Sequence, residues 1–562
     1  MSGQKRHNKV VFKSYVQNQA WLFPPSLGDL IPSEHKVRLV SAAIDGMDLE
    51  CILSTYKGGG SSSYHPRMLL KVLVYGYIEK IYSSRGIEKA LKENICFMWL
   101  SGMQQPDHGT LNAFRRHRLN QTVKEVFAQV LLLLIEQGYV RLNDYYVDGT
   151  KMESVANRYT FVWSKNVARY KQSLLDKIAL LIAQIEQTNE QAETSAGQKE
   201  ESVLADEAKS VTDSEALKAA IERIDSSLAK SKDSKKTLKK KQTKLKHLKE
   251  KHLPKLQHYE KQERKLDGRN SYSKTDVDAT FMRTKDDHLG NGQLKPCYNI
   301  QLGTTEQFAI NYTIHQTASD MACFTEHMDS TLELLEQIKV DTPKNIVADA
   351  GYGSQENYEY LEDKDIEAYV KYPGFYKENQ GKFKNPFDWR TLFYNEQADF
   401  FICPMGQRMY KIAQSEKQSS NGKTQIINHY RAANCKGCPL KGTCFKAKGN
   451  RLIKVNLKSR QYQNAARKRL ETLKGQRKRK QRNIDVEPVF GHIKQNRGFR
   501  RFTLRDLDGV NIEMGLLLIA HNFKKWHTKK TPSEIPLPKI KQANSNALSI
   551  PLQKSLQVKK VA

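Results

Sequence analysis

Asn-Ile-Val-Ala-Asp-Ala-Gly-Tyr-Gly, residues 345–353, is the stretch of sequence that decides the fold. Its apolar residues predict a short buried strand, which ends at Asp349 and is followed by a turn containing two glycines. A similar stretch, Tyr-Tyr-Val-Asp-Gly-Thr at 145–150, predicts a second strand ending at Asp148. Far along the chain, a helix is expected to begin at Asp485 and to carry Glu487 in its first turn.

The elements between these acids complete a mixed α/β domain. Residues 298–302 and 309–314 alternate as the two strands of a hairpin, residues 321–338 and 356–362 are predicted helices, and residues 366–370 are a further strand. With two long insertions removed, this is the element order of an RNase-H-like domain with a mixed sheet. Carboxylates at the ends of two neighbouring strands and on a later helix can converge on one point.

Three converging carboxylates suit metal-assisted phosphodiester chemistry. Hydrolysis needs an activated water, neutralised charge on the phosphate and a stabilised leaving oxygen, and two divalent ions about 3.5–4 Å apart supply all three. Mg²⁺ prefers a few carboxylates together with water and substrate oxygens. We therefore expect Asp148, Asp349 and Glu487 to hold two Mg²⁺ (or Mn²⁺) ions per active site. Asp485 is the expected cap of the last helix, whose positive end would favour the ionised form of Glu487.

The rest of the chain divides into regions of different character. Apolar residues at spacings of three and four, among many charges, predict an inserted antiparallel helical hairpin with a flexible centre at 188–213. Its role is either a spacer or an arm that touches DNA. The expected division is a helical N-terminal domain at 1–140, the catalytic domain at 141–163, 267–373 and 483–530, the helical insert at 164–266, a cysteine-rich insert with a basic segment at 374–482, and a disordered tail at 531–562.

The chain is strongly basic. Its 562 residues include 92 Lys and Arg against 61 Asp and Glu, a formal charge of +31, which indicates a polyanionic partner. A membrane is the weaker choice, because the longest apolar run, at 130–135, is too short to span a bilayer. No signal-peptide pattern follows Lys5 and Arg6. We therefore expect a soluble intracellular protein whose partner is a nucleic acid, with ribosomal RNA as one alternative.

Candidate DNA-binding residues lie in two basic segments. The N-terminal region predicts helices at 68–82 and 86–100, and the basic segment 110–118 after the next turn fits a helix-turn-helix. A solvated basic helix would have the same composition. The second basic segment surrounds and follows Glu487. The candidate DNA contacts are Arg115, Arg116, Arg118, Arg482, Lys494, Arg497, Arg500 and Arg501.

Four of the eight cysteines are clustered, at Cys403, Cys435, Cys438 and Cys444. Cys435-Lys-Gly-Cys438 has the spacing with which two thiolates fold onto one zinc ion. We expect a structural Zn²⁺ that stabilises an insert with little core of its own. The alternative is a set of free thiols in a loop-rich insert.

Three motifs in the chain resemble those of a known family. Residues 146–151 (Tyr-Val-Asp-Gly-Thr-Lys), 347–354 (Val-Ala-Asp-Ala-Gly-Tyr-Gly-Ser) and 486–494 (Val-Glu-Pro-Val-Phe-Gly-His-Ile-Lys) resemble the acidic motifs of bacterial insertion-sequence DDE transposases, and Arg-Gly-Phe-Arg-Arg-Phe at 497–502 also fits. The chain is most similar to large members that carry a cysteine-rich insert. The resemblance implies an enzyme that binds terminal inverted repeats, cleaves DNA strands by metal-assisted hydrolysis and joins the freed 3′-OH to target DNA. It also implies a bacterial cytoplasmic protein, associated with the nucleoid, that acts on double-stranded DNA as a homo-oligomer.

The family also has a Tyr, Arg, Glu, Lys signature on its last helix, which this chain keeps in part. Glu487 and Lys494 match by spacing, so the resemblance implies that Lys494 grips a phosphate near the cut. Asn483 and Lys480 stand at the Arg and Tyr positions, and Arg482 is one residue away. An arginine role therefore does not carry over cleanly.

Two other functions fit parts of this sequence. A nuclease of the same fold would cut DNA without joining it, and a catalytically inactive DNA-binding protein would need only the basic surfaces. Other acids near the motifs are interpreted as caps or solvated charges, although Asp276 and Asp278 precede a strand and could approach the site. These other acids are Asp144, Asp276, Asp278, Asp320 and Asp485.

Overall fold

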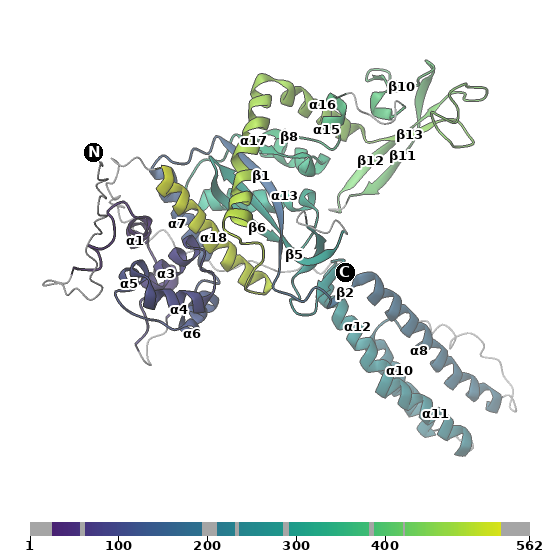
Figure 1. The fold of residues 1–562 in the computed structure, drawn as a ribbon. Coiled ribbons are helices and arrows are strands. Elements are labelled where there is room, and N and C mark those ends of the chain that lie inside the picture. The colour runs from purple at the N-terminus through teal and green to yellow at the C-terminus, as the bar shows by residue number, and fades with distance from the viewer. Residues whose placement is uncertain are drawn as a thin grey trace, which may run out of the picture.

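The structure is a computed structural model that describes residues 25–56, 62–193, 211–230, 235–284, 292–380, 387–419 and 422–529. Most of the predicted flexible segment 188–213, and all of the predicted tail 531–562, lie outside these ranges. The described residues form an α/β body from which a bundle of helices and a small second sheet project (Figure 1).

Short helices form the N-terminal part of the body. They are α1 (Lys36–Asp45), α2 (Glu50–Leu53), α3 (Pro66–Ile78), α4 (Ser84–Glu93), α5 (Ile95–Ser101), α6 (His108–Ala113), the π-helical turn η1 (Phe114–Arg118) and α7 (Val123–Glu136). The sequence predicts one helix at 86–100, but two helices occupy this stretch. Asn94 separates them, because its backbone is extended and its side chain accepts a hydrogen bond from the Cys96 amide, which caps α5.

A mixed sheet, six-stranded within the described residues, lies at the centre of the body. Its strands are β1 (Asp144–Glu153), β4 (Thr280–Arg283), β5 (Leu294–Thr305), β6 (Phe308–His315), β7 (Asn345–Ala348) and β8 (Glu367–Val370). The order is β4-β5-β1-β7-β8, with β6 paired to β5. β1 is antiparallel to β5 and parallel to β7, and β7 is parallel to β8. The predicted hairpin is formed by β5 and β6.

β1 extends further than the sequence predicts. The expected strand ends at Asp148, but pairing with β5 continues from Asp148, opposite Leu302, to Glu153. Its other neighbour, β7, stops at Ala348. Asp148 therefore lies where β1 separates from β7, and the strand continues because β5 still supplies backbone hydrogen-bond partners.

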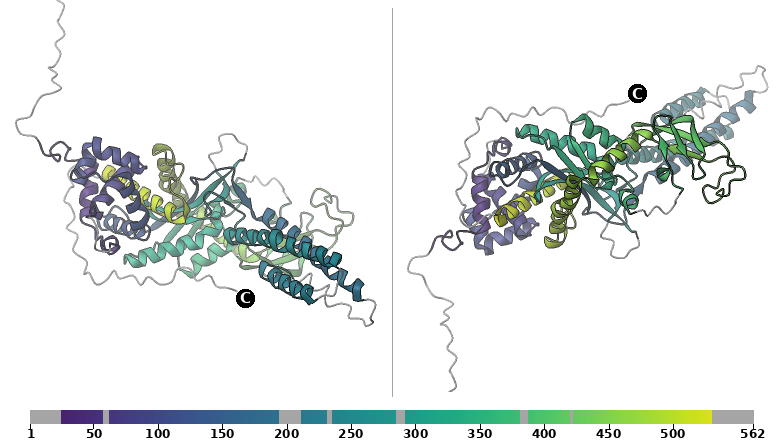
Figure 2. Two further views of the ribbon diagram at one scale, coloured as in Figure 1. Left: turned by 90° about the horizontal axis from the view of Figure 1, so that it is seen from below. Right: turned by 90° about the horizontal axis from the view of Figure 1, so that it is seen from above.

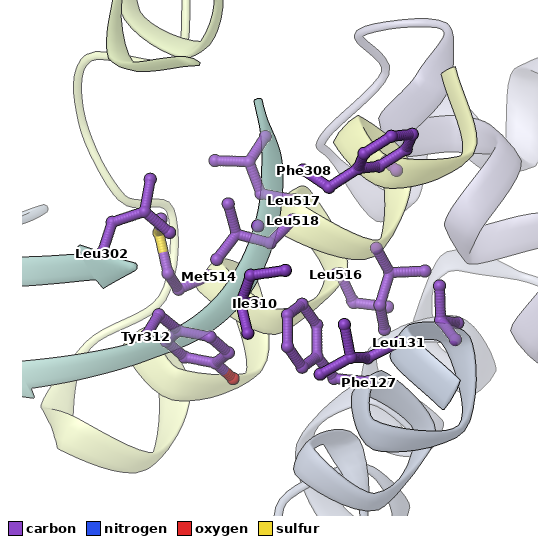
Figure 3. Close-up of a cluster of buried hydrophobic side chains, with 14 of the residues drawn as sticks. Phe127, Leu131, Leu302, Phe308, Ile310, Tyr312, Met514, Leu516, Leu517 and Leu518 are labelled. Atoms are coloured by element: carbon purple, nitrogen blue, oxygen red, sulfur yellow. The ribbon is translucent and has the colours of Figure 1, made fainter. Parts of the chain in front are cut away.

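Helices cover the sheet and join it to the N-terminal helices. They are α13 (Asp320–Gln337), α14 (Gln355–Asp363) and α18 (Asp506–Lys529). α13 packs on β5 and β6, and α18 packs on β6, α3 and α7. Figure 3 shows this apolar contact, where Phe127 and Leu131 of α7 lie near Ile310 of β6 and Leu516 of α18. All four side chains are buried, so one hydrophobic core joins the N-terminal helices to the sheet.

A bundle of helices projects from the body. It consists of α8 (Ser164–Glu193), α10 (Ser214–Lys230), α11 (Lys235–His247), the π-helical turn η2 (Leu248–His252) and α12 (Leu253–Leu266), with the paired strands β2 (Phe161–Trp163) and β3 (Ser271–Ser273) at its base. Figures 1 and 2 agree that these helices point away from the sheet. Ile178, Leu217 and Leu256 belong to a hydrophobic core of its own. The sequence predicts a hairpin of two helices. In the structure, three helical segments pack together, namely α8, α10 and the continuous segment from α11 to α12.

A second sheet and two basic helices follow β8. The elements are α15 (Phe375–Asn379), the 3₁₀ turn η4 (Trp389–Thr391), β9 (Tyr394–Asn395), β10 (Phe400–Ile402), β11 (Arg408–Gln418), β12 (Thr424–Ala432), β13 (Leu452–Val455), α16 (Leu457–Glu471), α17 (Leu473–Gly491) and the π-helical turn η5 (His492–Asn496). The order of this sheet is β13-β12-β11-β10-β9. The cysteine-rich segment therefore has a small antiparallel sheet as its frame.

α17 corrects the expected position of Glu487. The helix begins at Leu473 rather than at Asp485, and its N-cap is Thr472, whose Oγ1 accepts a hydrogen bond from the Gly475 amide. The residues after Leu473 are mainly Lys, Arg and Gln, which have high helix propensity. Glu487 thus lies near the C-terminal end of α17. Asp485 is not a cap but an interior residue of the helix, and its side chain is buried. The prediction that a positive helix end favours ionised Glu487 is wrong.

Candidate active site

Asp148 and Asp349 lie next to each other at one edge of the sheet. The residues before them, Val147 and Ala348, are paired in the parallel register of β1 and β7, so the two acids follow at the same level. The Gly149 amide donates to Asp148 Oδ1 at 2.9 Å, and the Gly351 amide donates to Asp349 Oδ1 at 2.7 Å. Local hydrogen bonds therefore hold both carboxylates in position.

Glu487 reaches the same edge from α17, which packs on β1, β5, β7 and β8. The helix is anchored two residues earlier by Asp485, whose carboxylate accepts hydrogen bonds from Thr304 Oγ1 at 2.7 Å and from the Gln307 amide at 3.0 Å. Burial raises the pKa of Asp485. This anchor fixes the part of α17 that presents Glu487, whose side chain is 53% exposed.

The guanidinium of Arg482 joins the three acids. Its Nη2 lies 3.0 Å from Asp148 Oδ2 and 4.0 Å from Asp349 Oδ2, and its Nη1 lies 3.4 Å from Glu487 Oε1. The Arg482 side chain is 5% exposed, so these interactions are less screened by water than surface ion pairs are. The structure thus brings together acids from β1, from the turn after β7 and from α17.

The contact of Arg482 with the three acids was not predicted from the sequence. The sequence predicted Arg482 as a DNA contact instead. A signal existed in the run of helix-forming residues from 473 onward. In a continuous helix, Arg482 lies between one and two turns before Glu487. The expected helix start at Asp485 concealed that relation.

Lys494 also approaches the site, from the turn η5 after α17. Its Nζ donates to the backbone oxygen of Lys151 at 3.0 Å. Lys151 belongs to β1, the strand that carries Asp148. The lysine therefore lies along the same strand as the first acid.

Asp276 and Asp278 have structural partners elsewhere. Asp276 is buried and accepts hydrogen bonds from the Tyr298 hydroxyl at 3.0 Å, and Asp278 accepts one from the Leu507 amide at 3.0 Å. Asp276 also accepts one from the amide of Asp506, the first residue of α18. These bonds connect the segment before β4 to the start of α18.

Two of the predicted DNA contacts are buried. Arg115 and Arg497 are 4% and 2% exposed. Their guanidinium groups donate to the backbone oxygens of Tyr82, at 3.1 Å, and Tyr77, at 2.9 Å. Both side chains therefore stabilise the packing of α3 against its neighbours.

Apart from Arg482, the other predicted DNA contacts have more access to solvent. Arg500 and Arg501 are exposed, and Arg116, Arg118 and Lys494 are half-buried. Arg118 stacks on Tyr56, with its guanidinium carbon 4.3 Å from the ring centroid.

The donor set around Arg482 has the chemistry that a hard divalent cation prefers, because three carboxylates share one positive group. In the part of the chain that the structure describes, no three His, Cys, Asp or Glu side chains are grouped closely enough to hold a metal ion as they stand. The acids contact the guanidinium instead. Carboxylates are ligands that divalent ions prefer. In the structure, the three carboxylates are arranged around the guanidinium of Arg482.

The four clustered cysteines line one small cavity beside the second sheet, together with Arg451. All four are free thiols. Arg451 Nη1 donates to Cys444 Sγ at 3.0 Å, and its backbone amide donates to Cys435 Sγ at 3.4 Å. Burial raises the pKa of the Cys444 thiol. The four cysteines therefore line the same cavity with a cationic side chain beside them, and no three of these described thiols are grouped closely enough to hold a metal ion as they stand.

Two family models match the chain. Residues 402–527 match a transposase DDE domain, and residues 25–117 match a transposase domain, DUF772. No curated protein and no solved structure matches. Both models describe transposase domains. Together the two matches indicate, more narrowly, an insertion-sequence DDE transposase.

The DDE match covers only part of the candidate site. Glu487, Lys494 and the cysteine cluster lie within residues 402–527, whereas Asp148 and Asp349 lie outside them. The two aspartates are therefore assigned from their motifs and from their position beside Glu487. Among the described helices, none combines the length and apolar character needed to cross a bilayer.

Proposed function

We propose that this transposase binds the terminal inverted repeats of its insertion sequence, cleaves the DNA strands and joins the freed 3′-OH ends to target DNA, as a homo-oligomer on the DNA. The observation that carries the proposal is the meeting of Asp148, Asp349 and Glu487 around Arg482 at one edge of the sheet. We also propose that the catalytic domain is RNase-H-like. The strand order and the parallel and antiparallel pairings of β5, β1, β7 and β8 support that fold.

The three acids are the groups that would hold two Mg²⁺ or Mn²⁺ ions. When bound, such ions supply an activated water, neutralise charge on the phosphate and stabilise the leaving oxygen. Lys494, which lies along β1, is placed to grip a phosphate near the cut. The exposed Arg500 and Arg501 would attract the DNA backbone.

Two segments are proposed as insertions into the catalytic domain. The helical bundle between β2 and β3 has its own hydrophobic core, and so does the second sheet. Separate cores support the view that each segment folds around itself and leaves the mixed sheet intact. We further propose that the four clustered cysteines hold a structural Zn²⁺ in the second of these segments.

Strand cleavage and joining on a duplex that carries the terminal repeats test the proposed function. Asp148→Asn, Asp349→Asn and Glu487→Gln should each fold and bind the duplex but lose at least about a thousandfold in cleavage rate, because each removes a charged metal ligand. Activity should require Mg²⁺ or Mn²⁺ and fail in Ca²⁺, which takes longer and looser oxygen coordination.

Asp363→Asn is the matched control, since Asp363 is an exposed acid at the end of α14. A control at Asp144, which is closer to Asp148 in sequence, would disturb the fold, because Asp144 pairs with Lys478 and accepts a hydrogen bond from Asn345 Nδ2 at 2.8 Å. Cleavage at the wild-type rate in any of the three variants would exclude that acid. Cut ends without joined products would favour a nuclease, and DNA binding without cleavage by the wild type would favour an inactive DNA-binding protein.

A further inference from the structure

Asp320 brings a fourth carboxylate to the edge of the sheet that carries Asp148 and Asp349. It is the first residue of α13, and a β-carbon placed on Gly149 would lie 2.8 Å from its Oδ1. A β-carbon placed on Gly351 would lie 3.9 Å from its Oδ2. Because Gly149 follows Asp148 and Gly351 is two residues after Asp349, the Asp320 carboxylate lies against both segments that carry the aspartates.

Gly149 leaves room for this approach. Successive residues of a strand face opposite sides of a sheet, so Gly149 faces α13 while Asp148 faces Arg482 of α17. A side chain at Gly149 would collide with Asp320 and with Gln301, whose Nε2 would lie 2.6 Å from the added β-carbon. Acids therefore reach this edge from both sides of the sheet.

The sheet, rather than its own helix, holds Asp320 in place. Oδ1 accepts hydrogen bonds from Asn299 Nδ2 at 2.8 Å and from Gln301 Nε2 at 3.1 Å, and both amides are buried on β5. Oδ2 lies 3.9 Å from Lys151 Nζ, and the Asp320 side chain is 29% exposed. A favourable helix dipole alone would not require two buried side-chain donors. One oxygen is fixed by neutral groups, and the carboxylate keeps access to solvent.

Tyr352 supports the Asp320 carboxylate through Gln301. Its buried hydroxyl donates to Gln301 Oε1, which orients the amide nitrogen of Gln301 toward Asp320. Burial raises the pKa of Tyr352, and the negative charges of Asp148, Asp320 and Asp349 raise it further. Tyr352 therefore fixes Gln301, one of the two amides that hold the Asp320 carboxylate.

We propose that Asp320 is a fourth acidic ligand for the divalent ions of this site, and that Asn299 and Gln301 orient it. The inference rests on the proposed function, because it concerns the ions that would assist strand cleavage. Asp320 approaches from α13, and Glu487 approaches from α17. α13 and α17 therefore contribute one acid each, in addition to Asp148 on β1 and Asp349 after β7.

Calorimetric titration of the intact protein with MnCl₂, without DNA, tests the inference. Asp320→Asn keeps an oxygen that can accept the two amide hydrogen bonds but removes the charge. Its affinity for Mn²⁺ should fall at least about tenfold, since a charged ligand is lost, and Asp320→Glu should recover part of it. Glu336→Gln, an exposed acid on the same helix, should bind Mn²⁺ as the wild type does.

Thermal unfolding separates metal binding from a structural role. In EDTA, Asp320→Asn should melt no lower than the wild type, because it removes one of several neighbouring negative charges. Added Mn²⁺ should then raise its melting temperature less than that of the wild type. An equal rise, with equal Mn²⁺ affinity, would overturn the inference, and so would a large loss of stability in EDTA with unchanged Mn²⁺ binding.

Cleavage assays keep this inference distinct from the proposed function. If Asp148→Asn is inert while Asp320→Asn cleaves DNA and binds Mn²⁺ like the wild type, Asp320 is not a ligand and the proposed function stands. If Asp148→Asn cleaves at the wild-type rate, the proposed function fails. If both variants lose cleavage and Mn²⁺ affinity, the inference is supported.

Discussion

At the scale of single residues, Arg482 explains how three carboxylates stay together in the structure as it stands. Asp148, Asp349 and Glu487 would repel one another at neutral pH without a positive partner. Arg482 supplies that partner from within the fold, because its side chain is almost fully buried and contacts all three. Divalent ions bound by these carboxylates would neutralise them with more positive charge than the Arg482 guanidinium carries.

Arg482→Met should therefore destabilise the metal-free protein. Removing one partner of a buried ion pair costs about 3–5 kcal/mol, and we expect the lower end because Asp349 and Glu487 are 43% and 53% exposed. Mn²⁺ should restore much of the loss, since it neutralises the same carboxylates. Urea unfolding in EDTA and in MnCl₂ measures both effects.

Arg500→Met is the control for that experiment, because Arg500 is exposed and lies on the loop after η5. It should change the free energy of unfolding by no more than about 0.5 kcal/mol. Equal losses in the two variants, or no loss in Arg482→Met, would show that the guanidinium does not hold the acids together.

At the scale of elements, the segment with the four cysteines is stabilised by few apolar side chains. Its core consists of a handful of buried residues, such as Phe401, Met409 and Tyr430, and most of β11 is exposed. A segment of this kind commonly depends on a bound metal or on disulfides. The shared cavity of the cysteines is where such a metal would lie.

Protein purified without added metal should contain about one zinc per chain, bound by the clustered thiolates. Elemental analysis should find no zinc in the double variant Cys435→Ser, Cys438→Ser, and proteolysis should then cleave within 387–455 more readily than in the wild type. Cys51→Ser, a half-buried cysteine in α2, should keep its zinc. Unchanged zinc content in the double variant would exclude these ligands.

At the scale of the whole molecule, the dominant feature is the charge of +31. A surface with this excess attracts DNA through its phosphates and releases counterions when it binds. Basic segments occur both in the bundle, along α11, and in α17 near the acids. The bundle projects far from the sheet (Figure 2), so the basic surface is spread over a long molecule.

Binding to duplex DNA should weaken steeply as salt rises. Each phosphate contact contributes about −0.9 to the slope of log affinity against log salt concentration. Replacing both Arg500 and Arg501 by Gln should reduce the slope by about 2 if each contacts a phosphate. Affinity measured across a salt series decides this, and a flat dependence in the wild type would contradict the proposed DNA partner.

Much of the mixed sheet could be predicted because its signals are local. The apolar run before Asp349, the alternation in β5 and β6 and the helical pattern of α13 each lie within one short stretch. The start of α17 could not be predicted in the same way. Its basic residues indicate a DNA-binding segment as readily as a helix, and the buried position of Asp485 depends on Thr304 of β5 and on Gln307 in the turn before β6.

By itself, the sequence indicated the three candidate acids, the order of most elements around them and the excess of positive charge. Each of these is a property of residues near one another in the chain or of composition. Only the tertiary structure decided that Arg482 joins the acids and that Asp320 stands beside them. Those positions arise because α13 and α17 pack against the same sheet, and packing brings together side chains that no sequence spacing relates.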